Sequence, residues 1–145
     1  MARYALLRKF VLCAIIAFGA AAIAPQPASA GISAQAEAVA NQGLDGCATY
    51  TGKQLRDCVA GVLDRIADTS PFPSVVRALR TAAAGVRAAA NKAQALSAIA
   101  ACQAVVASAF KLARTSGSSP QGILDGWDRL TRVLARAASL VQAKG

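Results

Sequence analysis

The sequence contains no histidine and only seven acidic residues among its 145. The absence of histidine excludes general acid–base catalysis by imidazole, histidine-containing triads and histidine metal sites. Aromatic residues make up only 5% of the chain and are not interleaved with the basic residues, so nucleic acid is not an expected partner. We therefore predict no catalytic, cofactor-binding or metal-ligating residue, and we expect a protein that is not an enzyme and needs no cofactor.

Acidic residues are missing altogether from one long stretch, since no Asp or Glu occurs between Asp68 and Asp125. The charged residues inside this stretch are all Lys or Arg. Such a segment either binds something negative or is neutralised by acids from elsewhere in the chain.

The first thirty residues have the three parts of a secretory signal peptide. Their apolar run of about 15 residues is shorter than the roughly 20 of a membrane span, so we expect cleavage after Ala30. The alternative is an uncleaved N-terminal anchor. Cleavage removes three positive charges, which lowers the net charge from +9 to +6, and predicts export to the periplasm or medium of a bacterium. The parts are a basic start, an apolar core and an A-x-A site: Arg3, Arg8 and Lys9, then residues 10–24, then Ala28 and Ala30.

Residues 31–145 are expected to form a single all-α domain, because alanine is abundant and is the best helix former. Helical segments are predicted over 32–44, 53–68, 74–115 and 120–143. The second is the clearest, since its apolar residues recur at the helical period from Leu55 to Ile66. The third would be near 60 Å long if straight, so we expect a break near Gly85 or near Asn91 and Lys92. The whole predicts an antiparallel bundle of three or four helices.

Local signals refine these boundaries. Thr51 with Gln54 resembles a capping box, and Ser119 followed by Pro120 resembles a helix start. The uncharged run 93–110 is long enough to span a membrane, but its polar and apolar residues separate onto different faces. We interpret it as a bundle helix, with membrane insertion as the alternative, and we interpret Trp127 as a core anchor.

An antiparallel hairpin of the second and third segments places three acids opposite three arginines. The same register aligns Ile66 with Leu79 and Val59 with Val86, which gives one apolar seam. Exposed pairs of this kind contribute about 0 to 1 kcal/mol each, so their expected role is to fix the register of the hairpin. The predicted pairs are Asp68 with Arg77, Asp64 with Arg80, and Asp57 with Arg87.

Some of the other basic residues have no predicted partner. Arg129 and Arg132 are predicted to pair only within their own helix, with Asp125 and Asp128 at i,i+4. Lys92 and Lys144 are among those left unpaired. Five bases form a candidate contact with an anionic surface, for which a solvated helix face is the simpler interpretation: Lys111, Arg114, Arg129, Arg132 and Arg136.

Three cysteines lie beyond the predicted signal peptide, Cys47, Cys58 and Cys102. One disulfide is expected in an oxidising compartment. We favour Cys47 with Cys58, because Cys47 lies in a loop only 11 residues before Cys58; Cys58 with Cys102 is the alternative, and three free thiols are a third. No C-x-x-C motif occurs, which excludes the common redox and haem-attachment motifs.

The function expected from the sequence is that of an exported, non-enzymatic helical protein of the cell envelope, with protein–protein interaction or a structural role. The partner would be another envelope protein. The alternative is a basic helical protein that binds an anionic membrane surface or another polyanion. A third hypothesis, an enzyme that uses aspartates and arginines on a bound substrate, requires a pocket that groups Asp with Arg. The sequence does not determine the oligomeric state.

Overall fold

The computed structural model describes residues 32–117 and 121–145. It confirms the all-α prediction, with five helices and no β-strand in the part described. The predicted signal peptide and the predicted cap at Ser119 and Pro120 lie outside the described residues. The helices are α1 (Ala34–Cys47), α2 (Gly52–Thr69), α3 (Pro73–Ala88), α4 (Lys92–Thr115) and α5 (Gln121–Lys144).

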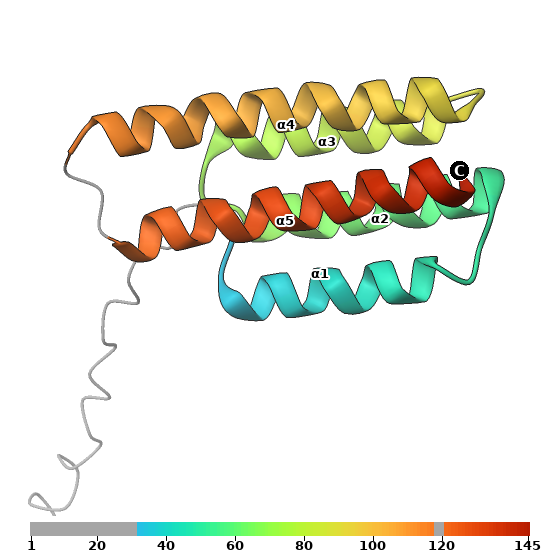
Figure 1. Cartoon of the computed structure of the whole chain (residues 1–145), viewed down its shortest axis with the longest axis horizontal. Helices are drawn as coiled ribbons and strands as arrows, with labels where there is room; N and C mark the ends of the chain where they lie inside the picture. The colour runs from blue at the N-terminus through green and yellow to red at the C-terminus, as the bar shows by residue number, and fades with distance from the viewer. Residues whose placement is uncertain (1–31, 118–120) are drawn as a thin grey trace, which may run out of the picture.

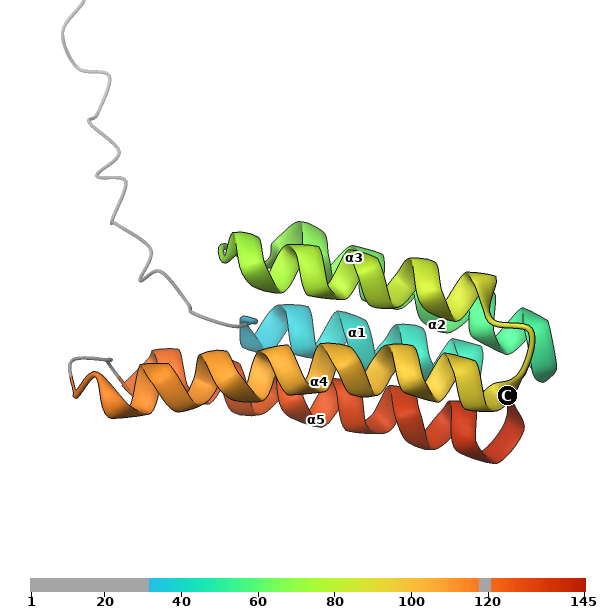
Figure 2. The ribbon, with the colours of Figure 1, turned by 90° about the horizontal axis from the view of Figure 1, so that it is seen from above.

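Successive helices run in opposite directions, so that α2, α3, α4 and α5 form an antiparallel bundle (Figure 1). The most extensive packing is between neighbours in sequence: α2 with α3, α3 with α4, and α4 with α5. Helix α1 lies beside both α2 and α5, and runs parallel to α5 (Figures 1 and 2). Because α3 and α4 lie on the opposite side of the molecule, α1 touches neither of them extensively.

The break predicted near Asn91 and Lys92 is confirmed, and the predicted third segment is two helices. Asn91 is the N-cap of α4, and its side-chain oxygen accepts from the backbone N–H of Gln94 at 3.0 Å. The Gln94 side chain accepts in return from the backbone N–H of Ala90 at 2.8 Å. This reciprocal capping explains why the chain starts a new helix here although alanines continue on both sides.

The capping box predicted at Thr51 is wrong in detail. Thr51 occupies the N-cap position of α2, but its side chain makes no capping hydrogen bond. The next residue, Gly52, has a φ of +55°, so the chain enters α2 through a left-handed residue that glycine tolerates best. In that geometry the Thr51 hydroxyl is not aligned with the free N–H groups of the first turn.

Buried side chains from all five helices form one hydrophobic cluster. Trp127 is 2% exposed, and its ring lies 5.4 Å from that of Phe72, so the prediction of a core anchor is confirmed. The α2 stripe predicted from the sequence is also buried, with Leu55 and Leu63 fully inside. This core joins the α2–α3 turn to the start of α5.

Helix α4 contains the uncharged run and is, within the described residues, the one helix long and apolar enough to cross a membrane by length and composition. In the bundle it lies between α3 and α5, and it buries a stripe at the helical period. The stripe consists of Ala95, Ile99, Cys102 and Val106.

Candidate interaction surface

Charge divides the bundle into two halves. Helices α1, α2 and α5 hold all seven acidic residues of the chain together with seven Lys or Arg. Helices α3 and α4 hold six Lys or Arg and no acid. We call these the balanced half (α1, α2, α5) and the acid-free half (α3, α4).

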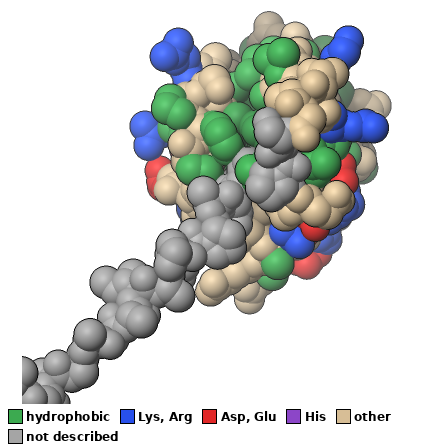
Figure 3. All heavy atoms as spheres, turned by 90° about the vertical axis from the view of Figure 1, so that its left-hand side faces the viewer, with side chains coloured by type: hydrophobic (Ala, Val, Ile, Leu, Met, Phe, Trp, Pro, Cys, Tyr) green, Lys and Arg blue, Asp and Glu red, His purple; other side chains and the backbone are tan. Residues whose placement is uncertain are grey.

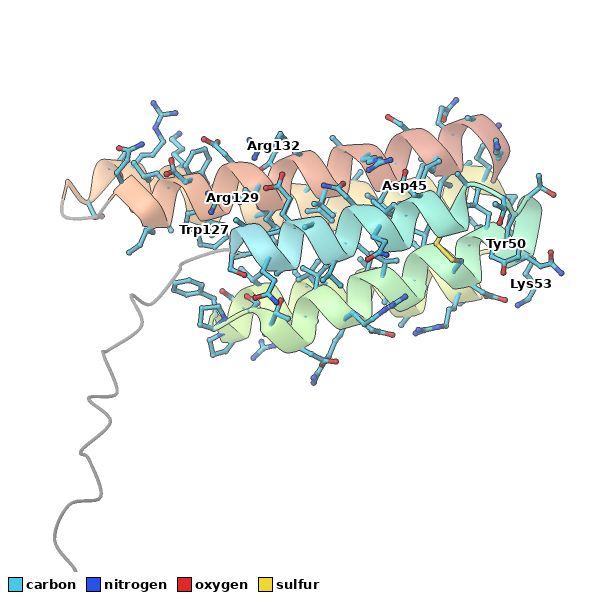
Figure 4. All side chains as sticks on the ribbon, turned by 90° about the horizontal axis from the view of Figure 1, so that it is seen from below. Asp45, Tyr50, Lys53, Trp127, Arg129 and Arg132 are labelled. Atoms are coloured by element: carbon cyan, nitrogen blue, oxygen red, sulfur yellow. A yellow bond between two sulfur atoms is a disulfide. The ribbon has the colours of Figure 1, made fainter. Side chains whose placement is uncertain are left out.

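The balanced half uses its acids to attach α1. Glu37 of α1 is 19% exposed and lies between two arginines of α5, with 3.4 Å from its Oε2 to Arg129 Nε and 3.0 Å from its Oε1 to Arg132 Nη2. One turn and two turns further along α1, Asn41 and Asp45 accept hydrogen bonds from Arg136. Figure 4 shows Arg129 and Arg132 on α5 beside α1, and Asp45 on α1 beside α5.

Arg129, Arg132 and Arg136, interpreted from the sequence as a solvated face or a candidate anionic contact, are instead paired with α1. Arg129 and Arg132 form their ion pairs with Glu37, not with Asp125 and Asp128 of their own helix. Pairs at i,i+4 contribute only a few tenths of a kcal/mol, whereas the half-buried Glu37 holds two arginines at once. The signal was present in the sequence as the spacing of Glu37, Asn41 and Asp45 along one helix face.

Two of the three arginines of α3 pair with acids of α2, but one turn or more out of the predicted register, and the predicted pair of Asp68 with Arg77 is wrong. Arg80 pairs with Asp68 at 3.2 Å, and Arg87 pairs with Asp64. Asp57 instead pairs with Lys53 of its own helix at 2.6 Å. The prediction ignored that helical side chains lean toward the N-terminus of their helix. A long arginine therefore reaches an acid nearer the α2–α3 turn than the one opposite its own Cα.

Two lysines that the sequence left unpaired bind the carboxyl ends of helices. Lys92 Nζ donates to the carbonyl oxygen of Gln142 near the end of α5 at 3.0 Å. Lys144 Nζ donates to the carbonyl oxygen of Ala48, just after α1, at 2.7 Å. A cation at these positions satisfies free carbonyl groups and favours the helix dipole.

Three bases of the acid-free half, Arg77, Lys111 and Arg114, have neither an ion pair nor a side-chain hydrogen bond with another described residue. Arg114 lies over the ring of Phe110, with its Cζ 5.6 Å from the ring centroid. In the end-on view, the upper part formed by α3 and α4 carries Lys and Arg but no acid (Figure 3).

Lys111 and Arg114 line a hollow between α4 and α5 together with Asp128. On another side of α4, an apolar groove runs between α3 and α4 beside Arg77. The two helices approach closely at Gly85, where a Cβ would lie 2.8 Å from the Cβ of Ala98. From there the groove opens toward the start of α3 into a hollow of about 380 Å³. Arg77 lines one edge, and the rest is mostly small or apolar: Ala78, Thr81, Ala82, Ala98, Ala101 and Val105.

The floor of this groove contains Cys102, which is 2% exposed and is not in a disulfide. Burial raises the pKa of its thiol from 9.0 to about 11. Because the thiolate is the reactive form, this thiol is inert at neutral pH. The disulfide instead joins Cys47 and Cys58, as favoured from the sequence, with the Cα atoms 5.6 Å apart. The alternative pairing of Cys58 with Cys102 is wrong.

A second hollow of about 240 Å³ lies between α1 and α2. Its lining is also apolar, with Ala36, Val39 and Ile66, and it has Arg65 at its edge. The Arg65 Nε donates to the Gly61 carbonyl oxygen at 3.3 Å. This hollow lies in the balanced half, where acids of the same two helices reduce its attraction for anions.

Sequence reasoning did not anticipate the burial of Arg56, which is 8% exposed. Its Nε has no hydrogen-bond partner in the part of the chain that the structure describes. Arg56 follows Leu55 in the first turns of α2 and packs its aliphatic stem in the bundle. No pattern in the sequence distinguishes it from the exposed arginines.

Comparison of the chain with protein-family models, with curated proteins and with solved structures finds no match.

Proposed function

We propose that this chain is an exported, non-enzymatic helical module of the cell envelope that binds another envelope protein through its acid-free half. One observation carries the proposal: Arg77 of α3, which has no ion pair among the described residues, stands at the edge of an apolar groove between α3 and α4. Isolated charges scattered over a surface need no partner, but unneutralised charge bordering an apolar hollow is typical of a recognition surface.

The use of the acids elsewhere supports the non-enzymatic part of the proposal. Five of the seven form ion pairs that attach one helix to another or lie along one helix. Asp125 accepts a hydrogen bond from Gln121 at 3.3 Å. The seventh, Asp128, lines a hollow with Lys111 and Arg114 but with no second acid among the described residues. Catalysis by a pair of carboxylates needs two acids grouped in one cleft, and the other six acids have structural roles instead.

Export is tested by the intact mass of the protein in each cell fraction, with and without reductant. We expect a species that begins at Gly31, is recovered from the periplasm or medium, and is two hydrogens lighter before reduction. A full-length species in the membrane fraction would mean that the N-terminal segment is kept as an anchor and is not cleaved.

Partner binding is tested by photo-crosslinking in intact envelopes. A photoreactive residue at exposed Thr81 or Ala101 in the groove should form one discrete adduct, and the same residue at exposed Gln42 of α1 should form none. The substitution Arg77→Glu should reduce the adduct, whereas Arg65→Glu in the balanced half should not. Equal capture from both halves, or capture from neither, contradicts the proposal.

A second candidate function, binding to an anionic membrane surface, is favoured by the exposure of Leu112 (70%) and Val105 (41%) on the same basic half. Such binding predicts sedimentation with vesicles that contain anionic lipid, weakened by salt and by Arg77→Glu. Indifference to such vesicles rejects this candidate.

A further inference from the structure

We propose that the groove between α3 and α4 binds an amphipathic helix with acidic residues, supplied by a different protein. The inference rests on the proposed function and names the chemistry of the partner. Three observations support it: the shape of the groove, the positive charge at its edge, and the fact that most acids of this chain are already paired with its own cations.

The shape of the groove fits a helix. Where α3 and α4 separate beyond the Gly85–Ala98 contact, the lining consists of alanines, Thr81 and Val105, which leaves a concave channel. The ridge of side chains on a helix packs into such a channel, and small lining residues let it approach closely. A flat lipid surface would not fill the channel, and membrane-surface helices use larger apolar residues than these.

The length of the surface also suits a helix. Four residues recur along one side of α4 at intervals of three, four and seven residues. This side faces α3 in the first part of α4 and is exposed in the last part. The residues are Ala98, Ala101, Val105 and Leu112. Their span corresponds to about 21 Å of helix, or about four turns. A partner of about 14 residues could therefore contact the whole stripe, including Leu112.

Charge selects an acidic partner. Arg77 stands at the edge of the groove. Lys111 is exposed on α4 one residue before Leu112, where it also lines the neighbouring α4–α5 hollow with Asp128. The acids of α2 nearest to α3, Asp64 and Asp68, are already held by Arg87 and Arg80. An acidic helix would supply the missing countercharge, and a basic one would be repelled.

A second copy of the same chain does not offer such a helix. Its helices α1, α2 and α5 contain acids, but five of the seven are in ion pairs within the bundle and Asp125 is hydrogen-bonded to Gln121. The seventh, Asp128, lines a hollow with Lys111 and Arg114 of its own chain. Because a second copy would have to take these acids from their own cations, an acidic helix of another protein fits the groove better.

The test uses two designed peptides of about 14 residues that share one Ala/Leu stripe. One has Glu on both flanks of the stripe, and the other has Lys at the same positions. Each is titrated into the isotope-labelled protein as recovered from cells, and backbone amide shifts are followed by NMR. The Glu peptide should shift amides of Ala78, Ala101 and Val105 saturably.

Charge-reversal variants give the decisive comparison. Arg77→Glu combined with Lys111→Glu should weaken binding of the Glu peptide about tenfold and allow the Lys peptide to bind. Both sites are exposed, so these variants should fold. The control Arg65→Glu, an exposed arginine of α2 in the balanced half, should leave both titrations unchanged.

Three results would overturn the inference: no saturable shift with either peptide, equal binding of both, or shifts centred on α1 and α2. Binding to vesicles with about one-third phosphatidylglycerol that depends on Arg77 and Lys111 would assign the face to a membrane instead. If envelope crosslinking from Thr81 still yields a discrete adduct while the peptides fail, the proposed function stands and only the acidic helix is wrong. If crosslinking fails as well, both are wrong.

Discussion

The balanced half and the acid-free half are made of similar alanine-rich helices, but different interactions hold them together. Helix α1 is attached by a disulfide to α2 and by ion pairs from Glu37 and Asp45 to α5. Helices α3 and α4 are joined by close contact of small residues at Gly85 and Ala98, with no ion pair between them among the described residues. The attachment of α1 engages the three arginines of α5, whereas Arg77 of α3 has no ion pair among the described residues.

The largest expected effect breaks the covalent attachment of the balanced half. The double substitution Cys47→Ala and Cys58→Ala should lower the free energy of unfolding by about 3 kcal/mol, because the bridge closes an 11-residue loop. Urea unfolding of the variant, with reduced wild-type protein as a control, measures this loss. A loss below about 1 kcal/mol would mean that the ion pairs of α1 suffice to hold it.

The next effect lies in the acid-free half and depends on pH. The Cys102 thiol has a pKa of about 11 in the folded protein against an ordinary 9.0. Below pH 9 the thiol is protonated in both the folded and the unfolded protein, so it causes no loss of stability. As the pH rises from 9 to 11, the unfolded thiol ionises first, which favours unfolding by up to about 2 to 3 kcal/mol.

Urea midpoints measured between pH 8 and 11 for wild type and Cys102→Ala isolate this contribution from other titrating groups. The wild type should lose more stability than the variant over this range. Parallel curves would show that the thiol is not sequestered under the groove.

Two glycines sharpen the contrast in packing. Gly85→Ala should destabilise the fold by about 1 to 2 kcal/mol, although alanine is the better helix former, since the added Cβ would meet Ala98 at 2.8 Å. Gly61→Ala in α2 has open space around its Cβ and should stabilise by about 0.5 to 1 kcal/mol. Thermal unfolding of both variants provides the comparison, and a stabilising Gly85→Ala would refute close packing of α3 on α4.

The smallest expected effects compare ion pairs of the two halves. Glu37→Gln should cost about 1 to 2 kcal/mol, because its carboxylate is only 19% exposed and holds two arginines. Asp64→Asn should cost about 0 to 1 kcal/mol, since the Asp64–Arg87 pair is more exposed, at 38% and 46%. Equal losses in chemical denaturation would mean that burial of the Glu37 cluster contributes nothing.

The sequence was a good guide wherever one helix decided the outcome. The stripe of α2, the break at Asn91 and Lys92, the burial of Trp127 and the Cys47–Cys58 bridge were all predicted and are present. Each depends on spacing within one segment or between near neighbours in the chain. Such local patterns are fixed by helical periodicity and by short loops.

Contacts between distant segments were predicted poorly. Arg129, Arg132 and Arg136 were assigned to solvent because their partners on α1 lie more than ninety positions earlier. Arg80 and Arg87 of α3 were given the right partner helix but the wrong acids: each pairs with an acid one turn or more nearer the α2–α3 turn, the direction in which long side chains of α3 lean.

By itself the sequence determined that this chain is all-helical, lacks the residues for histidine chemistry and has a long stretch without acids. Only the tertiary structure decided which charges are consumed and which remain, because pairing depends on which helix faces lie side by side. The packing of α1 on α5 uses three arginines, and the packing of α3 on α4 leaves Arg77 beside an open groove. A periodic pattern gives the face of each helix, but the arrangement of helices assigns each face its neighbour.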